Sequence, residues 1–282
     1  MSFTKKSIRV VLSSNKQDFI NGKNVIDFRG LPVELELDYA GIFSTAKIRI
    51  YGLSKIHVDS ITSISFFVTP YIPEFYIKVF IDEGLGEEEL YSGTVQKAVP
   101  NYTNAPDVFV EIESYAGTFS NLMDGIPPTS IDGDVLAPDL FRKLCQDYNV
   151  DFVNHNVQKV CGGSPRYDQV GFMNRLRKAA KDYDVYVELY NDAVHIWETS
   201  NKVWKITKDD YIGYPTFNQI GVGIVLDKAI RIRRSDSFVI SGSEIEAANG
   251  RWHVNTVKYS LSTRIGGKWQ VAVTGWRELL YE

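Results

Sequence analysis

The segment that decides the fold is Val33-Glu34-Leu35-Glu36-Leu37-Asp38-Tyr39, and Ala46-Lys47-Ile48-Arg49-Ile50-Tyr51 follows it. In both segments apolar and charged side chains alternate, which is the period of a β-strand with one buried face and one face in water. The wet face of the first segment is acidic, and that of the second is basic. We therefore predict two antiparallel neighbours whose opposite charges offset each other.

The rest of residues 1–117 predicts further short strands separated by turns, one of them at Asn21-Gly22. A short helix is predicted over Leu53–Ile64, with Ser54 as its cap. The additional strands are predicted at Ser7–Leu12, Phe75–Asp82, Leu90–Val99 and Asp107–Tyr115. Many short strands with a single short helix indicate a β-sandwich or a β-barrel.

Residues 118–200 follow a loop at Pro127-Pro128 and combine helices with strands. One helix is predicted to start near Pro138, and a second to be capped by Asp168 and to end near Tyr183. A hairpin is predicted from Val185–Tyr190 and Ala193–Glu198, joined by Asn191-Asp192. This part is therefore expected to be a small α+β insert.

Residues 201–282 return to strands, with a turn-rich stretch at Gly213–Gly223. Strands are predicted at Ala229–Arg233, Ser237–Ile240, Arg251–Leu261 and Trp269–Trp276. Hairpin turns are predicted at Asn249-Gly250 and Gly266-Gly267. The predicted fold class is β-rich: all-β apart from the small α+β insert.

Composition and charge describe a folded protein without the charge pattern of a nucleic-acid-binding protein. Of the 282 residues, 44% are hydrophobic and 23% charged, and the formal net charge is −4. A nucleic-acid-binding domain usually needs a strongly basic face. Residues 201–282 carry 12 basic and 8 acidic side chains and are mildly basic, whereas the preceding parts are mildly acidic. This asymmetry is typical of unequal solvated surfaces or of charge-complementary stacking between subunits.

The chemistry-bearing residues form no catalytic or metal-binding motif. The four histidines, His57, His155, His195 and His253, lack zinc-ligand spacing, and the last two are interpreted as residues on strand faces. Gly221-Val222-Gly223 lacks the following helix of a dinucleotide fingerprint and is interpreted as a loop. We predict no catalytic, cofactor-binding or metal-binding residues and no enzymatic activity, although 35 acidic residues leave a hydrolase with dispersed carboxylates open.

Cys145 and Cys161 are too few for a disulfide framework and favour assembly in a reducing cytoplasm, with Cys145 buried in a helix. Neither a signal peptide nor a membrane-spanning segment is expected, because the chain has no apolar run of the required length. The basic cluster at Ile230–Arg234 could serve nucleic-acid recognition, but a charged strand edge that blocks unwanted pairing is the favoured interpretation. Arg231, Arg233 and Arg234 are predicted as candidates for contact with an acidic neighbouring protein.

Several motifs resemble baseplate hub proteins of contractile-tailed phages, in chain order. The strand Ala46–Tyr51, ending in Gly52-Leu53-Ser54 before a helix, resembles the first barrel of that family, and so does Leu90–Val95. The stretch from Gly171 to Trp197 resembles its helix–helix–hairpin insert, and Asn249–Tyr259 is similar to its second barrel. The resemblance covers nearly the whole chain and extends to the N-terminal part of type VI secretion spike proteins.

The resemblance implies two tube-protein-like β-barrels, at residues 1–117 and 201–282, joined by the insert at residues 118–200. It implies a homotrimeric ring that adapts the sixfold tail tube to the threefold central spike, without a cofactor. The implied partners are the tail tube protein, the central spike protein, other baseplate subunits and a tape measure protein, and genome DNA would pass through the lumen without specific binding. The implied location is the virion tail baseplate, after assembly in the host cytoplasm.

One alternative from the residues themselves is a carbohydrate-binding β-sandwich rich in tyrosine and tryptophan. Trp197, Trp204 and Trp252 are its candidate sugar-stacking residues. The second alternative is the polysaccharide or peptidoglycan hydrolase with dispersed carboxylates.

Overall fold

Alternation of apolar and polar side chains produces a fold dominated by strands. The computed structural model describes residues 6–14, 22–39, 44–62, 75–103, 105–116, 128–168, 171–190, 193–198, 202–217 and 221–277. These residues form β-structure with a small helical insert, so the predicted fold class is confirmed. Among the described helices, none has the length and apolar character that crossing a membrane requires.

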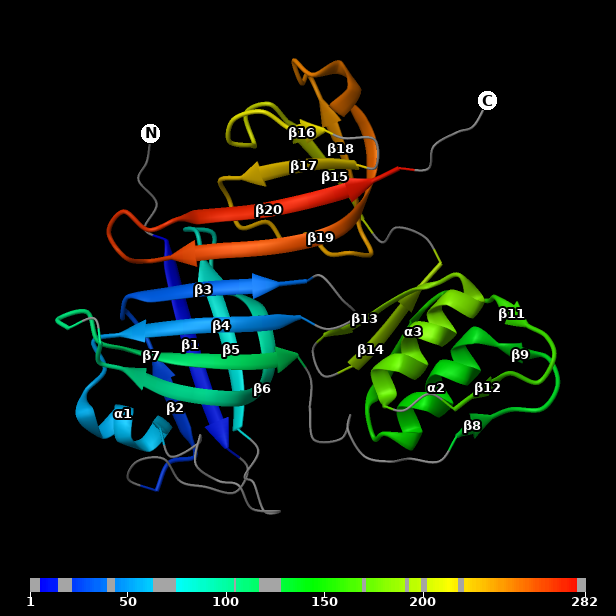
Figure 1. Ribbon diagram of the computed structural model, residues 1–282, viewed down its shortest axis with the longest axis horizontal. Helices are drawn as coiled ribbons and strands as arrows, with labels where there is room; N and C mark the ends of the chain where they lie inside the picture. The colour runs from blue at the N-terminus through cyan, green and yellow to red at the C-terminus, as the bar shows by residue number, and fades with distance from the viewer. Residues whose placement is uncertain are drawn as a thin grey trace.

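The strands of both β-rich parts join in one 13-stranded sheet of the described residues (Figure 1). Its main path runs β16-β17-β20-β19-β3-β4-β7-β6-β5-β1-β2, and β15 and β18 branch from β19. The N-terminal strands are β1 (Ser7–Ser14), β2 (Val25–Phe28), β3 (Val33–Asp38), β4 (Thr45–Tyr51), β5 (Phe75–Asp82), β6 (Glu88–Asn101) and β7 (Phe109–Ala116), with helix α1 (Lys55–Thr62) after β4. The C-terminal strands are β15 (Val203–Thr207), β16 (Thr216–Phe217), β17 (Gly221–Leu226), β18 (Ser237–Ser241), β19 (Gly250–Ser262) and β20 (Trp269–Trp276).

The two β-rich parts meet where β3 pairs antiparallel with β19, a contact that we call the seam. Leu37 lies opposite Tyr259, and Leu35 opposite Leu261. All four side chains are buried, and they belong to one hydrophobic core that extends into both parts. The seam therefore makes one continuous structure from segments that are far apart in the sequence.

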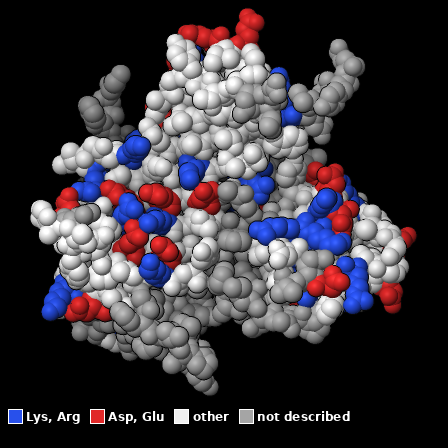
Figure 2. Space-filling model, viewed as in Figure 1, with Lys and Arg blue, Asp and Glu red and all other residues white. Residues whose placement is uncertain are grey.

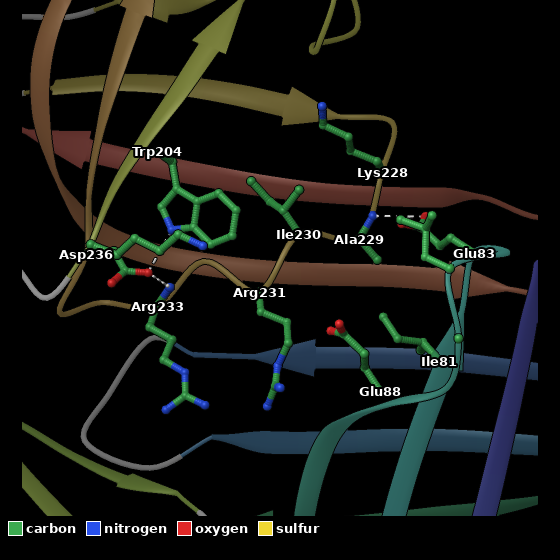
Figure 3. A pocket seen from close by; sticks show the side chains of 13 residues that line it. Ile81, Glu83, Glu88, Trp204, Lys228, Ala229, Ile230, Arg231, Arg233 and Asp236 are labelled. Carbon is green, nitrogen blue, oxygen red and sulfur yellow. Dashed lines mark hydrogen bonds between the residues drawn. The ribbon is translucent and has the colours of Figure 1, made fainter.

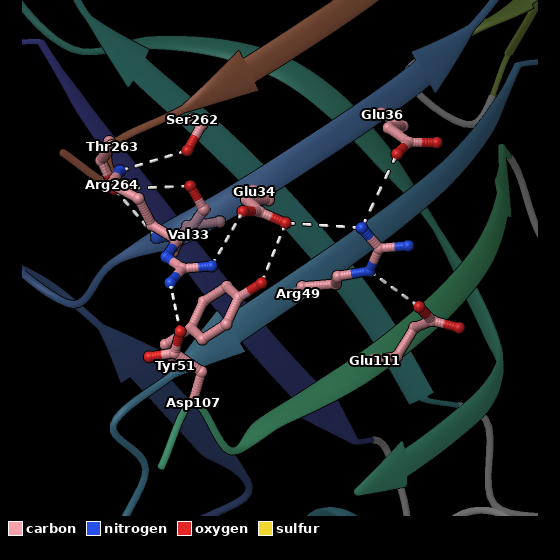
Figure 4. A network of polar contacts seen from close by, with 10 residues as sticks. All are labelled: Val33, Glu34, Glu36, Arg49, Tyr51, Asp107, Glu111, Ser262, Thr263 and Arg264. Carbon is pink, nitrogen blue, oxygen red and sulfur yellow. Dashed lines mark hydrogen bonds and ion pairs between the residues drawn. The ribbon is translucent and has the colours of Figure 1, made fainter. Parts of the chain in front are cut away.

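The charge pairing predicted between β3 and β4 is confirmed (Figure 4). Glu34 lies opposite Arg49, and Glu36 opposite Lys47. The Arg49 guanidinium lies 3.4 Å from Glu34 and 2.9 Å from Glu111 on β7. Opposite charges are also interleaved over this part of the surface in Figure 2, so this view presents no extended field of one sign over β3, β4 and β7.

The insert has a hydrophobic core of its own, formed by two amphipathic helices against a small sheet. Its helices are α2 (Ala137–Asp147) and α3 (Phe172–Tyr183). Its strands are β8 (Thr129–Ser130), β9 (Val135–Leu136), β10 (Asp151–His155), β11 (Val160–Cys161), β12 (Arg166–Tyr167), β13 (Tyr186–Tyr190) and β14 (Ala193–Trp197). β14 lies between β10, which is parallel to it, and β13, which is antiparallel. The predicted pair of helices and the predicted hairpin strands are thus confirmed.

Two predicted helix and turn signals are wrong. Asp168 does not cap α3, because the cap position is Gly171, which has a positive φ of 83°. Asn249-Gly250 is not a hairpin turn, because a short 3₁₀ helix (η3, Glu246–Ala248) lies between β18 and β19 and Gly250 already belongs to β19. The predicted hairpin at Gly266-Gly267 is confirmed between β19 and β20.

Two predictions for the C-terminal strands are also wrong. Ala229–Arg233 is not a strand, and its alternation reflects packing of Ile230 and Ile232 against the core from an irregular segment. Gly221-Val222-Gly223 is not a loop but the start of β17. A Cβ at Gly221 would lie 2.2 Å from the Gly275 carbonyl oxygen, so only glycine permits this close strand approach. Strand β15, at Val203–Thr207, was not predicted at all.

Some predicted features lie outside the described residues: Asn21, Ile64, Pro127, the Asn191-Asp192 turn and the residues at the boundaries between the three predicted parts. His195 and His253 do lie on strands, β14 and β19, as predicted. Cys145 is buried, and both cysteines are free thiols.

Candidate interaction site

A groove of about 630 Å³ lies between the two β-rich parts and carries two of the three predicted interface arginines (Figure 3). One wall is the turn between β5 and β6, from Ile81 to Glu88. The other is the irregular segment at residues 228–236, which we call the groove segment, together with Trp204 on β15. The side chain of Leu85, on the rim, is 99% exposed. A concave surface with charged walls and an exposed apolar rim is typical of a contact site.

Glu83 fixes the groove segment against the β5–β6 turn. Its Oε1 accepts hydrogen bonds from the backbone N–H of Ala229, at 3.1 Å, and from Trp269 Nε1, at 2.5 Å. On the side of the seam, the Tyr259 hydroxyl donates to the Ile230 carbonyl at 2.8 Å. Ordinary side-chain and backbone hydrogen bonds therefore hold a segment that has no strand partners of its own.

Asp236 anchors the other end of the groove segment. Its Oδ2 accepts from Trp204 Nε1 at 2.8 Å and from the Arg233 backbone N–H at 3.0 Å. The Asp236 side chain is buried, and desolvation raises its pKa despite these hydrogen bonds. Trp204 is thus positioned by a buried carboxyl group and lines the groove with part of its ring exposed.

The three predicted arginines have different surroundings. Arg231 and Arg233 line the groove, whereas Arg234 Nε donates to the Asn255 carbonyl at 2.9 Å. Arg233 Cζ lies 3.5 Å from the ring centroid of Tyr190 in the insert, a cation–π contact. Because the segment that carries them is irregular, the interpretation of these arginines as a strand-edge device is wrong.

Among the described residues, the groove holds a cation and a carboxylate that form no ion pair. Arg231 makes no ion pair with any of the described residues, and neither does Glu88 on the opposite wall. Lys228, in contrast, pairs with Asp210. A protein partner that presents an acidic side chain to Arg231 and a basic one to Glu88 would complement this groove.

A partly buried polar cluster in the insert has no counterpart among the sequence motifs. His155 and His195 are forty positions apart, yet parallel pairing of β10 and β14 places their ring nitrogens Nε2 and Nδ1 3.0 Å apart. The Tyr190 ring stacks on His195 with centroids 3.7 Å apart. Within the described part of the chain, no three potential ligands come close enough to hold a metal ion. Nothing in the local sequence signals the pairing of the two histidines, because parallel strands can be any distance apart in the chain.

The structure also bears on the alternative of a sugar-binding surface. The side chains of Trp197 and Trp252 are 2% and 1% exposed, so neither can serve as a stacking platform. Trp204 keeps part of its surface accessible, in the groove. Two of the three candidate sugar-stacking residues are therefore core residues.

Solved structures of other proteins have folds similar to that of this chain. No family model and no curated protein matches the chain. A 43 kDa tail protein of prophage MuSo2 from Shewanella oneidensis is 10% identical, with a TM-score of 0.59 over 95% of this chain and 96% of that chain. A tail protein from Neisseria meningitidis MC58 is 8% identical, with a TM-score of 0.64 and 97% of each chain covered. The chain has the fold of a phage tail protein.

A protein described as part of a type VI secretion system has a similar fold. The E. coli c3393 protein is described as a component of the type VI secretion system with structural similarity to T4 bacteriophage tail proteins. It is 8% identical, with a TM-score of 0.57 over 95% of this chain and 77% of that chain. The resemblance to phage tail and type VI secretion spike proteins is therefore confirmed at the level of the fold.

Proposed function

We propose that this chain is a structural, non-enzymatic subunit of a phage-type contractile tail, the baseplate hub that joins the tail tube to the central spike. The observation that carries the proposal is a tail-protein fold that extends over 95–97% of the chain in two separate tail proteins. The seam supports it, because it places two β-rich parts side by side in a single chain.

In the proposed arrangement, residues 1–117 and 201–282 each take the place of one tube subunit, and residues 118–200 form the insert between them. Three copies then present six tube-like units to the tube and threefold symmetry to the spike. The other proposed neighbours are baseplate subunits and the tape measure protein, with DNA passing through the lumen. The proposed location is the tail baseplate of the virion, with assembly in the host cytoplasm.

Oligomeric state tests this proposal directly. We expect light scattering of the purified chain with its tail tube protein to give the mass of a trimer, and electron microscopy to show threefold rings. A chain that stays monomeric at micromolar concentration, both alone and with tube protein, would contradict the proposal. Hydrolysis of peptidoglycan that is abolished by one carboxylate substitution would contradict its non-enzymatic part.

Charge reversal at the groove tests the proposed contact with an acidic neighbour. Arg231→Glu is expected to weaken ring assembly about tenfold at 50 mM salt and only about twofold at 500 mM, because salt screens exposed charges. Sedimentation velocity at both salt concentrations measures the effect. Arg234→Glu is the matched control, because Arg234 donates to Asn255 and does not line the groove. Equal assembly of wild type and Arg231→Glu at both concentrations would remove Arg231 from the interface.

A further inference from the structure

One face of the sheet β10-β14-β13 in the insert carries polar and aromatic side chains instead of an apolar layer. Glu188 on β13 lies directly opposite His195 on β14, and Tyr190 and Trp197 project from the same two strands. The alternate residues Leu189 and Val194 belong to the core of the insert. Because the Tyr190 ring contacts Arg233, this polar face meets the groove segment, a contact that we call the junction.

The carboxyl group of Glu188 is buried at the junction without a hydrogen-bond partner. Its side chain is 3% exposed, and neither carboxylate oxygen has a partner among the described residues. His195 Nε2 and Trp197 Nε1 are likewise buried without a partner there. Burial of an ionised carboxylate without hydrogen bonds is strongly unfavourable, so this environment favours the neutral acid. Desolvation raises the pKa of Glu188 to about 7, although Arg233 acts in the opposite direction.

Charged and titratable groups approach Glu188 from every element around it. The groove segment contributes Arg233, Arg234 and Asp236. Tyr39, which directly follows β3, and Tyr259 on β19 approach from the seam, and the insert contributes Tyr190 and His195. His195 stays neutral above pH 5, because desolvation and the neighbouring His155 and Arg233 lower its pKa to about 4. The tyrosines stay neutral as well, because burial raises their pKa values. The surroundings of Glu188 thus bring its pKa to neutral pH, where His195 and the tyrosines do not change charge.

Arg233 makes the contact that opening of the junction would break. Its guanidinium lies on Tyr190, whose ring is also stacked on His195, and it forms no ion pair with Glu188 in this structure. An ionised Glu188 would be a buried charge without hydrogen bonds, and opening of the junction would return its carboxylate to water. Opening would also separate Arg233 on the groove segment from Tyr190 on the insert.

We propose that Glu188 controls the junction: its neutral form keeps Arg233 on Tyr190 and the insert docked, and its ionised form loosens that contact. This inference does not depend on the proposed function. It couples the charge of one buried residue to the groove segment, which also carries Arg231.

The direction of the pH effect follows from the raised pKa. The open junction restores the ordinary pKa of Glu188, 4.5, whereas the closed junction holds it at about 7. The free-energy difference that favours the closed junction is therefore largest below pH 4.5. It decreases as pH rises from 4.5 to 7 and is constant above pH 7. The equilibrium constant for opening is expected to increase about 70-fold between pH 5 and pH 8.

Hydrogen exchange of the full chain, followed by mass spectrometry and expressed as protection factors, tests the proposal. In the wild type, peptides from the groove segment and from β13 are expected to lose protection about 70-fold from pH 5 to pH 8. Glu188→Gln, which keeps the shape but cannot ionise, is expected to show no such loss. Glu244→Gln, on the exposed loop before η3, is the matched control and should behave like the wild type.

A second variant keeps the test decisive if Glu188→Gln fails to fold. Arg233→Gln removes the cation that lowers the pKa of Glu188, so the loss of protection should continue above pH 7. Equal pH dependence in the wild type and Glu188→Gln, or an Arg233→Gln profile that levels off at the wild-type pH, would overturn the proposal.

Discussion

Replacement of Trp252 by alanine is expected to lower the free energy of unfolding by about 4 kcal/mol, as truncation of a fully buried aromatic residue usually does. The Trp252 side chain is 1% exposed, and its Nε1 donates to the Ala248 carbonyl at 2.8 Å. The neighbouring strand β20 is packed closely against this site, because a Cβ at Gly275 would lie 2.6 Å from Phe238 and 2.9 Å from Trp252. The cavity left by Trp252→Ala therefore cannot collapse easily, and a buried carbonyl loses its donor.

Urea unfolding followed by circular dichroism measures this loss. Tyr214→Ala is the matched control, because that aromatic side chain is 67% exposed, and it should change stability by no more than about 0.5 kcal/mol. A loss below about 1 kcal/mol in Trp252→Ala would mean that the core around β18, β19 and β20 is looser than the structure describes.

Removal of the Glu83 carboxylate is expected to cost about 3 kcal/mol and to release one wall of the groove. Glu83→Ala leaves the Ala229 N–H and Trp269 Nε1 without their acceptor, and each charge-assisted hydrogen bond contributes about 1.5–3 kcal/mol. Trp269 is 7% exposed, so water cannot easily replace the carboxylate. Hydrogen exchange should report faster opening of residues 228–232 in this variant.

Glu83→Gln separates the hydrogen bonds from the charge. Its amide oxygen can accept from the same donors, so we expect a loss of only about 1 kcal/mol and a protected groove segment. Equal effects of alanine and glutamine at this position would show that charge, and not hydrogen bonding, holds the groove segment.

Local alternation predicted the strands well where each strand has one wet face. The bounds of β5 and β20 agree with the prediction, and the pairing of β3 with β4 followed from their opposite charges. Such patterns can be recognised in sequence because successive residues of a half-buried strand alternate between apolar side chains in the core and polar side chains in water.

Features set by close approach or by distant pairing could not be predicted this way. β17 begins with glycines because the Gly275 carbonyl occupies the space of a Cβ, and glycines in sequence suggest a turn. Ala229–Arg233 alternates because it packs against the core, without strand partners. The candidate groove combines the β5–β6 turn, Trp204 and the groove segment, so its geometry depends on the assembled fold. The arginines were identified because they cluster in sequence, and Glu88 lies in a run of glutamates that indicated a solvated hairpin tip, whereas Glu83 gave no comparable signal.

The seam has a consequence for synthesis on the ribosome. About 210 residues separate β3 from β19, and at about 5–20 residues per second they take on the order of 10–40 s to translate. During that time β3 can pair with β4, but its second edge stays unpaired until β19 has been translated. An unpaired edge invites strands from neighbouring nascent chains, and the acidic side chains of Glu34 and Glu36 discourage such encounters. We therefore expect unfinished copies on crowded polysomes to be more prone to edge-to-edge pairing than the finished chain, in which β19 covers this edge.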